Sequence, residues 1–159
     1  MIRVGLGEDI HILVAGRPLM LCGLEIPYEK GLLGHSDGDA GLHAIADALL
    51  GAIGKGDIGA LFPPSDPSIR GIDSAKILQK AYEEVKTAGY SLVNLDVNIV
   101  TEEPKLRPYI EPMKARLAQI LGVDVSCVSV KAKTNEGCDA VGEKKAIRAN
   151  AAVLIEKGR

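Results

Sequence analysis

The sequence predicts an α+β fold in which helices pack on one face of a mixed sheet. Apolar and polar residues alternate from Leu92 to Val100, which is the period of a strand with one buried face. The segment from Ile147 to Ile155 is almost entirely apolar, so we expect a strand that is central in the sheet or covered by another subunit. Apolar residues recur at helical spacing in three further segments, and no internal repeat or low-complexity tract interrupts the pattern.

Composition limits the size of the fold and the kinds of partner. A chain of 159 residues fits one domain, residues 1–159, or a small domain that completes itself by oligomerising. The core must be built from Leu, Ile, Val and Ala, because the chain has one Phe and no Trp. A net charge of −2 argues against a nucleic-acid binder, which needs a basic face. We therefore expect a small ligand.

Cysteine usage and the N-terminus bear on the compartment. The three cysteines, Cys22, Cys127 and Cys138, form no C-x-x-C pair, so neither a disulfide framework nor a thiolate zinc site is indicated. Each is expected to be a small buried apolar residue, except Cys138, which lies in a polar loop. The chain enters a strand at once and has no apolar run of transmembrane length. A cytoplasmic protein with no membrane partner is the expectation.

The first elements are a strand, a ribbon and a helix. A strand at Ile2–Gly5 is expected to carry Asp9 and His11 at its end. A turn rich in Gly and Pro leads to a short β-ribbon formed by residues 19–22 and 24–27.

The first helix is expected to begin near Asp37, with Ser36 or Asp37 as its N-cap, and to end near Ile53. Its apolar face is formed by Leu42, Ile45, Ala46, Leu49, Leu50 and Ile53.

The segment from Asp57 to Pro67 is too rich in Pro and Gly for regular structure and too apolar for a simple linker. We interpret it as an ordered functional loop, and a turn-rich connector is the alternative. A second helix, capped by Asp73 or Ser74, is expected to end at Gly89.

The remaining elements alternate strands and a helix. The strand at 92–100 is followed by a charged loop from Thr101 to Pro108 and a third helix that ends at Gly122. A strand from Val128 to Lys133 leads to a polar tip at Thr134–Gly137 and then to the apolar last strand.

The residues from Gly34 to His43 are the densest in chemistry, with two His, two Asp and a Ser where a loop runs into a helix. The free N–H groups of the first helical turn predict a site suited to an anion. Asp39, His43 and Asp47 follow one another at i, i+4 steps and are expected to share the polar face of that helix.

Asp9, His11 and His43 form a candidate metal site. In the sequence Asp9-Ile10-His11, a carboxylate and an imidazole point to the same side of an extended backbone. Zinc held by three protein groups keeps a fourth position open for a substrate oxygen, whereas a structural site has four ligands. The alternative for His43 is an ordinary hydrogen-bonded histidine, and spacing alone does not decide between the two.

Four segments of the chain resemble the 2-C-methyl-D-erythritol 2,4-cyclodiphosphate synthase family, and together they span nearly its whole length. They are Asp9-x-His11, the run HSDGDAGLHAIADALLGA from His35 to Ala52, GDIGALFP from Gly56 to Pro63, and PYI at Pro108 together with KAKTNE from Lys131 to Glu136.

The resemblance implies a homotrimer of ferredoxin-like subunits, each with a mixed four-stranded sheet, helices on one face and a short β-ribbon. Active sites would lie between neighbouring subunits. The reaction that it implies closes 4-diphosphocytidyl-2-C-methyl-D-erythritol 2-phosphate to the 2,4-cyclodiphosphate and releases CMP, a step of the non-mevalonate isoprenoid pathway.

The same resemblance implies the metal ions and the catalytic groups. Zinc would bind Asp9, His11 and His43, and Mg²⁺ or Mn²⁺ would bridge two phosphates with help from Glu136. His35 and Thr134 would be catalytic, and together with the backbone at Ser36 they would hydrogen-bond phosphate oxygens. Asn135 and Glu136 would also contact the substrate.

Substrate contacts are implied for two further groups of residues. The methylerythritol hydroxyls would be held by a group consisting of Asp57, Ile58 and Gly59, under a closing loop that contains Phe62, Ser65 and Asp66. Cytosine and ribose would be received by Thr101, Pro104, Lys105, Leu106 and Arg107. Lys105 and Lys133 would add positive charge near phosphates, and a solvated loop lysine is the alternative for Lys105.

One segment departs from the commoner family pattern. In many members a phenylalanine and an arginine line a cavity on the trimer axis that is proposed to hold an isoprenoid diphosphate. Ala140 and Glu143 stand at those positions here, so this ligand is not carried over.

Two other functions remain open on the residues alone. One is a zinc-dependent phosphoesterase, which would use the same ligands with a metal-bound water. The other is a non-catalytic trimeric module that binds a nucleotide or a terpenoid phosphate.

Overall fold

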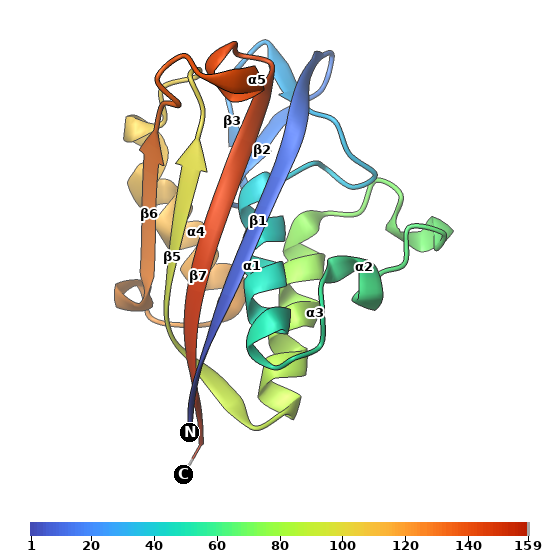
Figure 1. The fold of residues 1–159 in the computed structure, drawn as a ribbon, viewed down its shortest axis with the longest axis vertical. Coiled ribbons are helices and arrows are strands. Elements are labelled where there is room, and N and C mark those ends of the chain that lie inside the picture. Colours follow the sequence, from blue (N-terminus) through green and yellow to red (C-terminus); the bar gives the residue numbers. More distant parts are fainter. Residues whose placement is uncertain (159) are drawn as a thin grey trace.

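A mixed sheet with helices on one side forms the body of the computed structural model, which describes residues 1–158 (Figure 1). Arg159, the last residue of the predicted domain, lies outside the described residues. The sheet has five strands in the order β4-β1-β7-β5-β6, and β2 and β3 form a separate ribbon. The strands are β1 (Ile2–Ala15), β2 (Leu19–Leu21), β3 (Leu24–Ile26), β4 (Lys30–Leu32), β5 (Tyr90–Val100), β6 (Val128–Lys133) and β7 (Ala146–Lys157).

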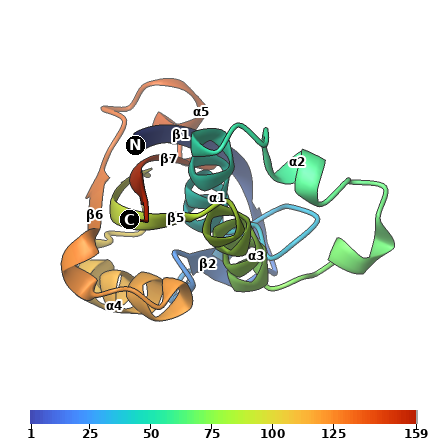
Figure 2. The same ribbon diagram turned by 90° about the horizontal axis from the view of Figure 1, so that it is seen from below.

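The long helices cover one face of this sheet. They are α1 (Ala40–Ala52), α3 (Ser74–Thr87) and α4 (Ile110–Leu121), all on the same side of β1, β7 and β5 (Figure 2). Two shorter helices are α2 (Ile58–Leu61) and α5 (Asp139–Gly142). The main core lies between the sheet and the long helices, and it is built mainly of Leu, Ile, Val and Ala, as the composition predicts. Within residues 1–158, no helix combines the length and apolar character needed to cross a bilayer.

Two glycines on β1 let α1 approach the sheet closely. A Cβ on Gly5 would lie 1.8 Å from the carbonyl oxygen of Ala48, and one on Gly7 would lie 2.0 Å from that of Ala44. No larger side chain fits at such separations, so only glycine permits this contact. His43 directly precedes Ala44 on α1, so the close contact also holds His43 over β1.

The sheet differs from the prediction in the number of strands and in the length of the first. It has five strands instead of four, because β4 adds to the free edge of β1, with Leu13 opposite Leu32. The first strand extends to Ala15 and does not end at Gly5, since it pairs with β7 from Ile2 to Ile12. Asp9 and His11 therefore lie inside β1 and not at its end.

The predicted N-cap of the first helix is wrong. Gly38 has a φ of +78°, which interrupts the helix before it begins, and Asp39 is the N-cap. The prediction of a loop without regular structure at 57–67 is also wrong in part, because the segment contains α2 and a 3-10 turn at Pro67–Ile69. Asp57 and Asp66 cap these two short elements.

Other predictions are confirmed. β7 lies between β1 and β5, as expected of a strand apolar along nearly its whole length. Asp73 caps α3, Gly122 ends α4 in a left-handed conformation, and β6 has the predicted bounds. The ribbon is present, Cys22 is buried, and Cys138 is exposed.

The opposite face of the sheet has a row of exposed apolar side chains on β1. The helices pack on the other face, as Figure 2 shows, so this row is not covered by them. The row is formed by Ile2, Val4, Leu6, Ile10 and Ile12, each more than half exposed.

Candidate active site

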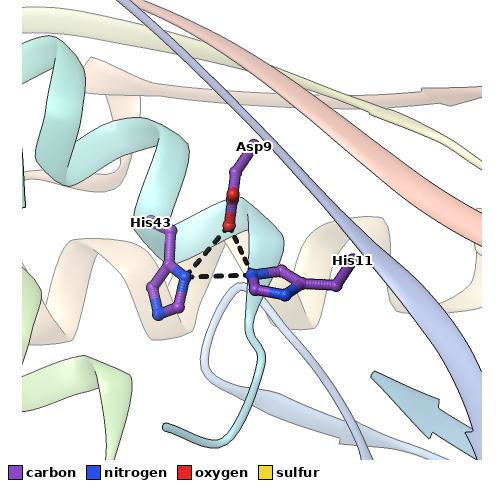
Figure 3. A group of neighbouring side chains, drawn as sticks. All are labelled: Asp9, His11 and His43. Carbon is purple, nitrogen blue, oxygen red and sulfur yellow. Dashed lines mark hydrogen bonds and ion pairs between the residues drawn. The ribbon is translucent and has the colours of Figure 1, made fainter. Parts of the chain in front are cut away.

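Asp9, His11 and His43 converge where the N-terminal part of α1 crosses β1 (Figure 3). Asp9 and His11 are two positions apart on the strand, so both point toward α1, and His43 comes from the first turn of that helix. Asp9 Oδ2 lies 2.7 Å from His11 Nε2 and 3.0 Å from His43 Nδ1. The two ring nitrogens are 3.3 Å apart. One ligand atom from each residue thus faces a common centre.

The outer nitrogen of each imidazole is held by a hydrogen bond. His11 Nδ1 lies 2.8 Å from the carbonyl oxygen of Leu33, which can only accept, so Nδ1 carries a proton. His43 Nε2 lies 3.0 Å from Ser36 Oγ and 2.9 Å from Ser74 Oγ. With their outer nitrogens held in this way, both rings can present a lone pair to the centre. One carboxylate and two oriented imidazoles fit a divalent ion such as zinc.

Charge at the centre is shared between the carboxylate and the imidazoles. Burial alone would raise the pKa of Asp9, but the hydrogen bonds and charges of His11 and His43 outweigh it and lower the pKa to about 2. Burial alone would lower the pKa of His11, but the hydrogen bond and the charge of Asp9 outweigh it and raise the pKa of His11. Positive charge is therefore favoured between these groups, whether protons or a metal ion supply it.

Asp39 does not share the polar face with His43, contrary to the prediction. Its side chain is fully buried and accepts hydrogen bonds from the backbone N–H groups of Cys22, Gly23 and Leu42 at 2.9, 2.7 and 3.0 Å. The carboxylate therefore joins the ribbon to the start of α1. As the N-cap it takes the Leu42 N–H, one of the free N–H groups that the sequence offers to an anion.

Asp47 lies one turn beyond His43 and holds the segment that contains Asp57, Ile58 and Gly59. Its Oδ1 accepts a hydrogen bond of 2.8 Å from the backbone of Ile58. Burial raises the pKa of Asp47, and this hydrogen bond opposes the effect. The predicted methylerythritol segment is thus tied to the same helix as His43. Farther along, Phe62 is half-buried, whereas Ser65 and Asp66 are exposed.

A cleft of about 600 Å³ brings together most of the residues predicted to receive the nucleotide. It lies between the loop before α4 and the C-terminal part of β6. Lys105 and Arg107 are exposed there and Leu106 is buried. The predicted residues that line it are Thr101, Pro104, Lys105, Leu106, Arg107, Lys133 and Thr134.

The turn beyond this cleft holds Asn135 and Glu136. Glu102 Oε1 accepts hydrogen bonds from the backbone N–H groups of Asn135 and Gly137, at 2.8 and 3.3 Å. Glu136 is exposed and does not belong to the group formed by Asp9, His11 and His43. Within residues 1–158, none of those three residues lines the cleft. The two halves of the predicted site are therefore separate in a single chain.

The contacts behind His43 were not predicted from the sequence. The sequence indicates only a possible helix cap at Ser74, yet the side chain of Ser74 reaches His43 and Asp37. Arg17 donates to the carbonyl oxygens of Gly34 and Ser36, at 3.3 and 2.8 Å, and so supports the loop that carries His35. Long-range contacts of this kind leave no periodic signal in a sequence.

The fold and the site define an α+β protein with a candidate metal-binding group of three residues and a separate cleft. The chain belongs to the YgbB family, which matches residues 2–156.

Known relatives are similar over nearly their whole length. A 2-C-methyl-D-erythritol 2,4-cyclodiphosphate synthase of Bacillus subtilis is 54% identical over 158 residues, which are 99% of this chain and 100% of the relative. A solved structure of 2C-methyl-D-erythritol-2,4-cyclodiphosphate synthase in a CDP-bound form has a TM-score of 0.90 at 42% identity, covering 97% of this chain and 100% of that one. A Plasmodium falciparum IspF–CDP complex has a TM-score of 0.87 at 35% identity, covering 99% and 97%.

Proposed function

We propose that the chain converts 4-diphosphocytidyl-2-C-methyl-D-erythritol 2-phosphate to 2-C-methyl-D-erythritol 2,4-cyclodiphosphate and CMP, in the non-mevalonate isoprenoid pathway. The observation that carries the proposal is the convergence of Asp9, His11 and His43, with both imidazoles oriented, in a chain 54% identical to such a synthase. Residues 1–159 act as one catalytic domain.

The metal ions follow from the donor sets. Zinc fits Asp9, His11 and His43, because three protein ligands leave a position for a substrate oxygen. When bound, zinc and a second ion, Mg²⁺ or Mn²⁺ near Glu136, supply Lewis-acid polarisation and charge neutralisation at the phosphates.

The chain needs no nucleophile of its own for this reaction. An oxygen of the substrate's 2-phosphate forms a bond to the β-phosphorus, the bond from that phosphorus to the bridging oxygen breaks, and CMP leaves with that oxygen. The protein therefore acts by positioning the phosphates and stabilising charge. His35 and Thr134 are the proposed catalytic donors to phosphate oxygens, helped by the backbone at Ser36.

Each end of the substrate has its own binding group. The methylerythritol part binds at a group consisting of Asp57, Ile58, Gly59, Phe62, Ser65 and Asp66, which α1 holds through the contact of Asp47 with Ile58. The cytidine part binds in the cleft beside α4, where Lys105 and Lys133 supply positive charge, and Asn135 follows the cleft residue Thr134 in the chain.

A homotrimer with active sites between subunits accounts for the separation of these groups. One substrate has to touch both the metal ligands and the cleft, which lie apart in a single chain. The apolar row of Ile2, Val4, Leu6, Ile10 and Ile12 also needs a cover, and a neighbouring subunit supplies one. The cytoplasmic location stays a prediction.

Product analysis tests this proposal. The purified protein is incubated with the cytidyl substrate and Mg²⁺, with and without a zinc chelator, and the products are identified by mass spectrometry. We expect CMP and the cyclic diphosphate, both lost when zinc is removed. Release of CMP with a linear product would identify a phosphoesterase. If no CMP were released, the protein would be a non-catalytic binding module.

A further inference from the structure

Ser74 is a fully buried hydroxyl residue that reaches the metal-binding group from a different helix. It is the first residue of α3, and its side chain has no exposed surface. Its Oγ lies 2.9 Å from His43 Nε2, although the two residues are 31 positions apart in the chain. Neither helix capping, for which Asp73 suffices, nor the proposed substrate contacts account for this placement.

The direction of the hydrogen bond is fixed by Asp37. The Ser74 hydroxyl donates to Asp37 Oδ1, and the Ser74 backbone N–H donates to Asp37 Oδ2 at 3.0 Å. A carboxylate can only accept, so the hydroxyl proton of Ser74 is used and its oxygen remains as an acceptor. That acceptor takes the Nε2 proton of His43, which leaves Nδ1 with its lone pair toward Asp9 and His11.

Ser36 also contacts His43 but lacks a charged partner of this kind. Its Oγ lies 3.0 Å from His43 Nε2, accepts from the backbone N–H of Gly38 at 3.3 Å, and lies 3.3 Å from Ser74 Oγ. None of these groups forces the hydroxyl of Ser36 to act as an acceptor toward the ring. In contrast, the carboxylate of Asp37 takes the hydroxyl proton of Ser74, so the Ser74 oxygen has to act as the acceptor toward the ring.

We propose that Asp37 and Ser74 are positioning residues for the metal centre. Their carboxylate–hydroxyl–imidazole chain holds His43 with Nε2 protonated and with Nδ1 aimed at the ion. Partners behind metal-bound imidazoles commonly fix the tautomer and the ring orientation in this way. The inference rests on the proposed zinc site of Asp9, His11 and His43.

Backbone hydrogen bonds beside these contacts hold Gly71 and Ile72 against the loop that carries His35. Gly71 N–H donates to the carbonyl oxygen of His35 at 2.7 Å, and Asp37 N–H donates to that of Ile72 at 3.3 Å. Gly71, Ile72 and the loop with His35 are therefore joined by backbone hydrogen bonds, and Asp37 and Ser74 connect this loop to the ring of His43.

Zinc affinity and the spectrum of the cobalt-substituted protein test this role without a turnover assay. We expect Ser74→Ala and Asp37→Asn to bind zinc about 10–100-fold more weakly in competition with a chromophoric chelator. Their Co²⁺ absorption bands should shift, because the ring of His43 is no longer fixed. Ser74→Thr keeps the hydroxyl and should bind zinc more tightly than Ser74→Ala. Ser91→Ala, at an exposed serine of β5, is the matched control and should match the wild type.

A measurement on the wild type keeps the test independent of folding. In the zinc-loaded protein, long-range ¹H–¹⁵N spectra should show His43 with Nε2 protonated and Nδ1 bound to the ion, and the reverse pattern would overturn the inference. A folded Ser74→Ala variant with wild-type zinc affinity and Co²⁺ spectrum would also overturn it. If Ser36→Ala weakened binding and Asp37→Asn did not, Ser36 would be the positioning residue instead. A wild type that binds no zinc would refute the metal site itself.

Discussion

The close contact between β1 and α1 predicts a large effect of adding one methyl group at Gly7. A Cβ at this position would lie 2.0 Å from the Ala44 carbonyl oxygen and 2.7 Å from the Ala48 nitrogen, whereas ordinary contacts begin at 3.4 Å. Both are backbone atoms, so α1 as a whole has to move from the strand by about 1.4 Å. Overpacking of this kind costs about 1–3 kcal/mol of unfolding free energy. Gly7→Ala should therefore lower the melting temperature by roughly 2–4 °C for each kcal/mol.

The displacement should also weaken the metal site, since His43 comes directly before Ala44. Gly51→Ala is the matched control, because a Cβ there lies 3.9 Å from its nearest neighbour, the carbonyl oxygen of Leu6, and α1 gains an alanine. Thermal unfolding of zinc-free samples at one protein concentration compares the two variants, and chelator competition gives their zinc affinities. If Gly7→Ala were as stable as the wild type with unchanged zinc affinity, the close contact would not be what holds His43.

Three further predictions concern the site. Asp9→Ala or His43→Ala should abolish cyclic product and zinc binding while the circular dichroism spectrum stays native; wild-type turnover of either variant after metal stripping would contradict the zinc assignment. Because Asp9 raises the pKa of His11, zinc has to displace a proton from His11 at pH values below that pKa, so zinc affinity should fall as pH decreases. Calorimetry in buffers of different ionisation enthalpy would count the released protons, and a zinc affinity that does not change with pH would contradict this prediction. Lys105→Ala should weaken CDP binding, most strongly at low salt, and an unchanged dissociation constant would make Lys105 a solvated loop residue.

The sequence predicts the elements whose signals are local. Asp73 and Gly122 mark the start of α3 and the end of α4, and the alternation in β5 shows which of its faces is buried. The common face of Asp9 and His11 is also predictable, because a two-residue spacing on a strand puts both side chains on one side. The spacing leaves open whether His43 joins them, and the structure places it there.

What the sequence does not predict depends on contacts between distant segments. Gly5 and Gly7 look like strand breakers, but they remain in β1 because β7 pairs with it and α1 packs against it. Asp39 has the same i, i+4 spacing to His43 as Asp47, yet it is buried as an N-cap, because the backbone turn at Cys22 supplies donors to its carboxylate. The role of Ser74 depends on how α3 docks, which no local pattern records.

Two kinds of force hold His43, and they can be separated experimentally. The packing of α1 at Gly7 sets the distance from the ring to β1, whereas Ser74 sets the orientation of the ring. Gly7→Ala should therefore destabilise the zinc-free protein as well as weaken zinc binding. Ser74→Ala should act mainly on zinc binding. Added zinc stabilises the folded protein by an amount that grows with the logarithm of zinc concentration over the dissociation constant. Ser74→Ala should therefore reduce this zinc-dependent stabilisation. Equal losses of zinc-free stability in the two variants would mean that Ser74 supports the packing of α3 more than the metal site.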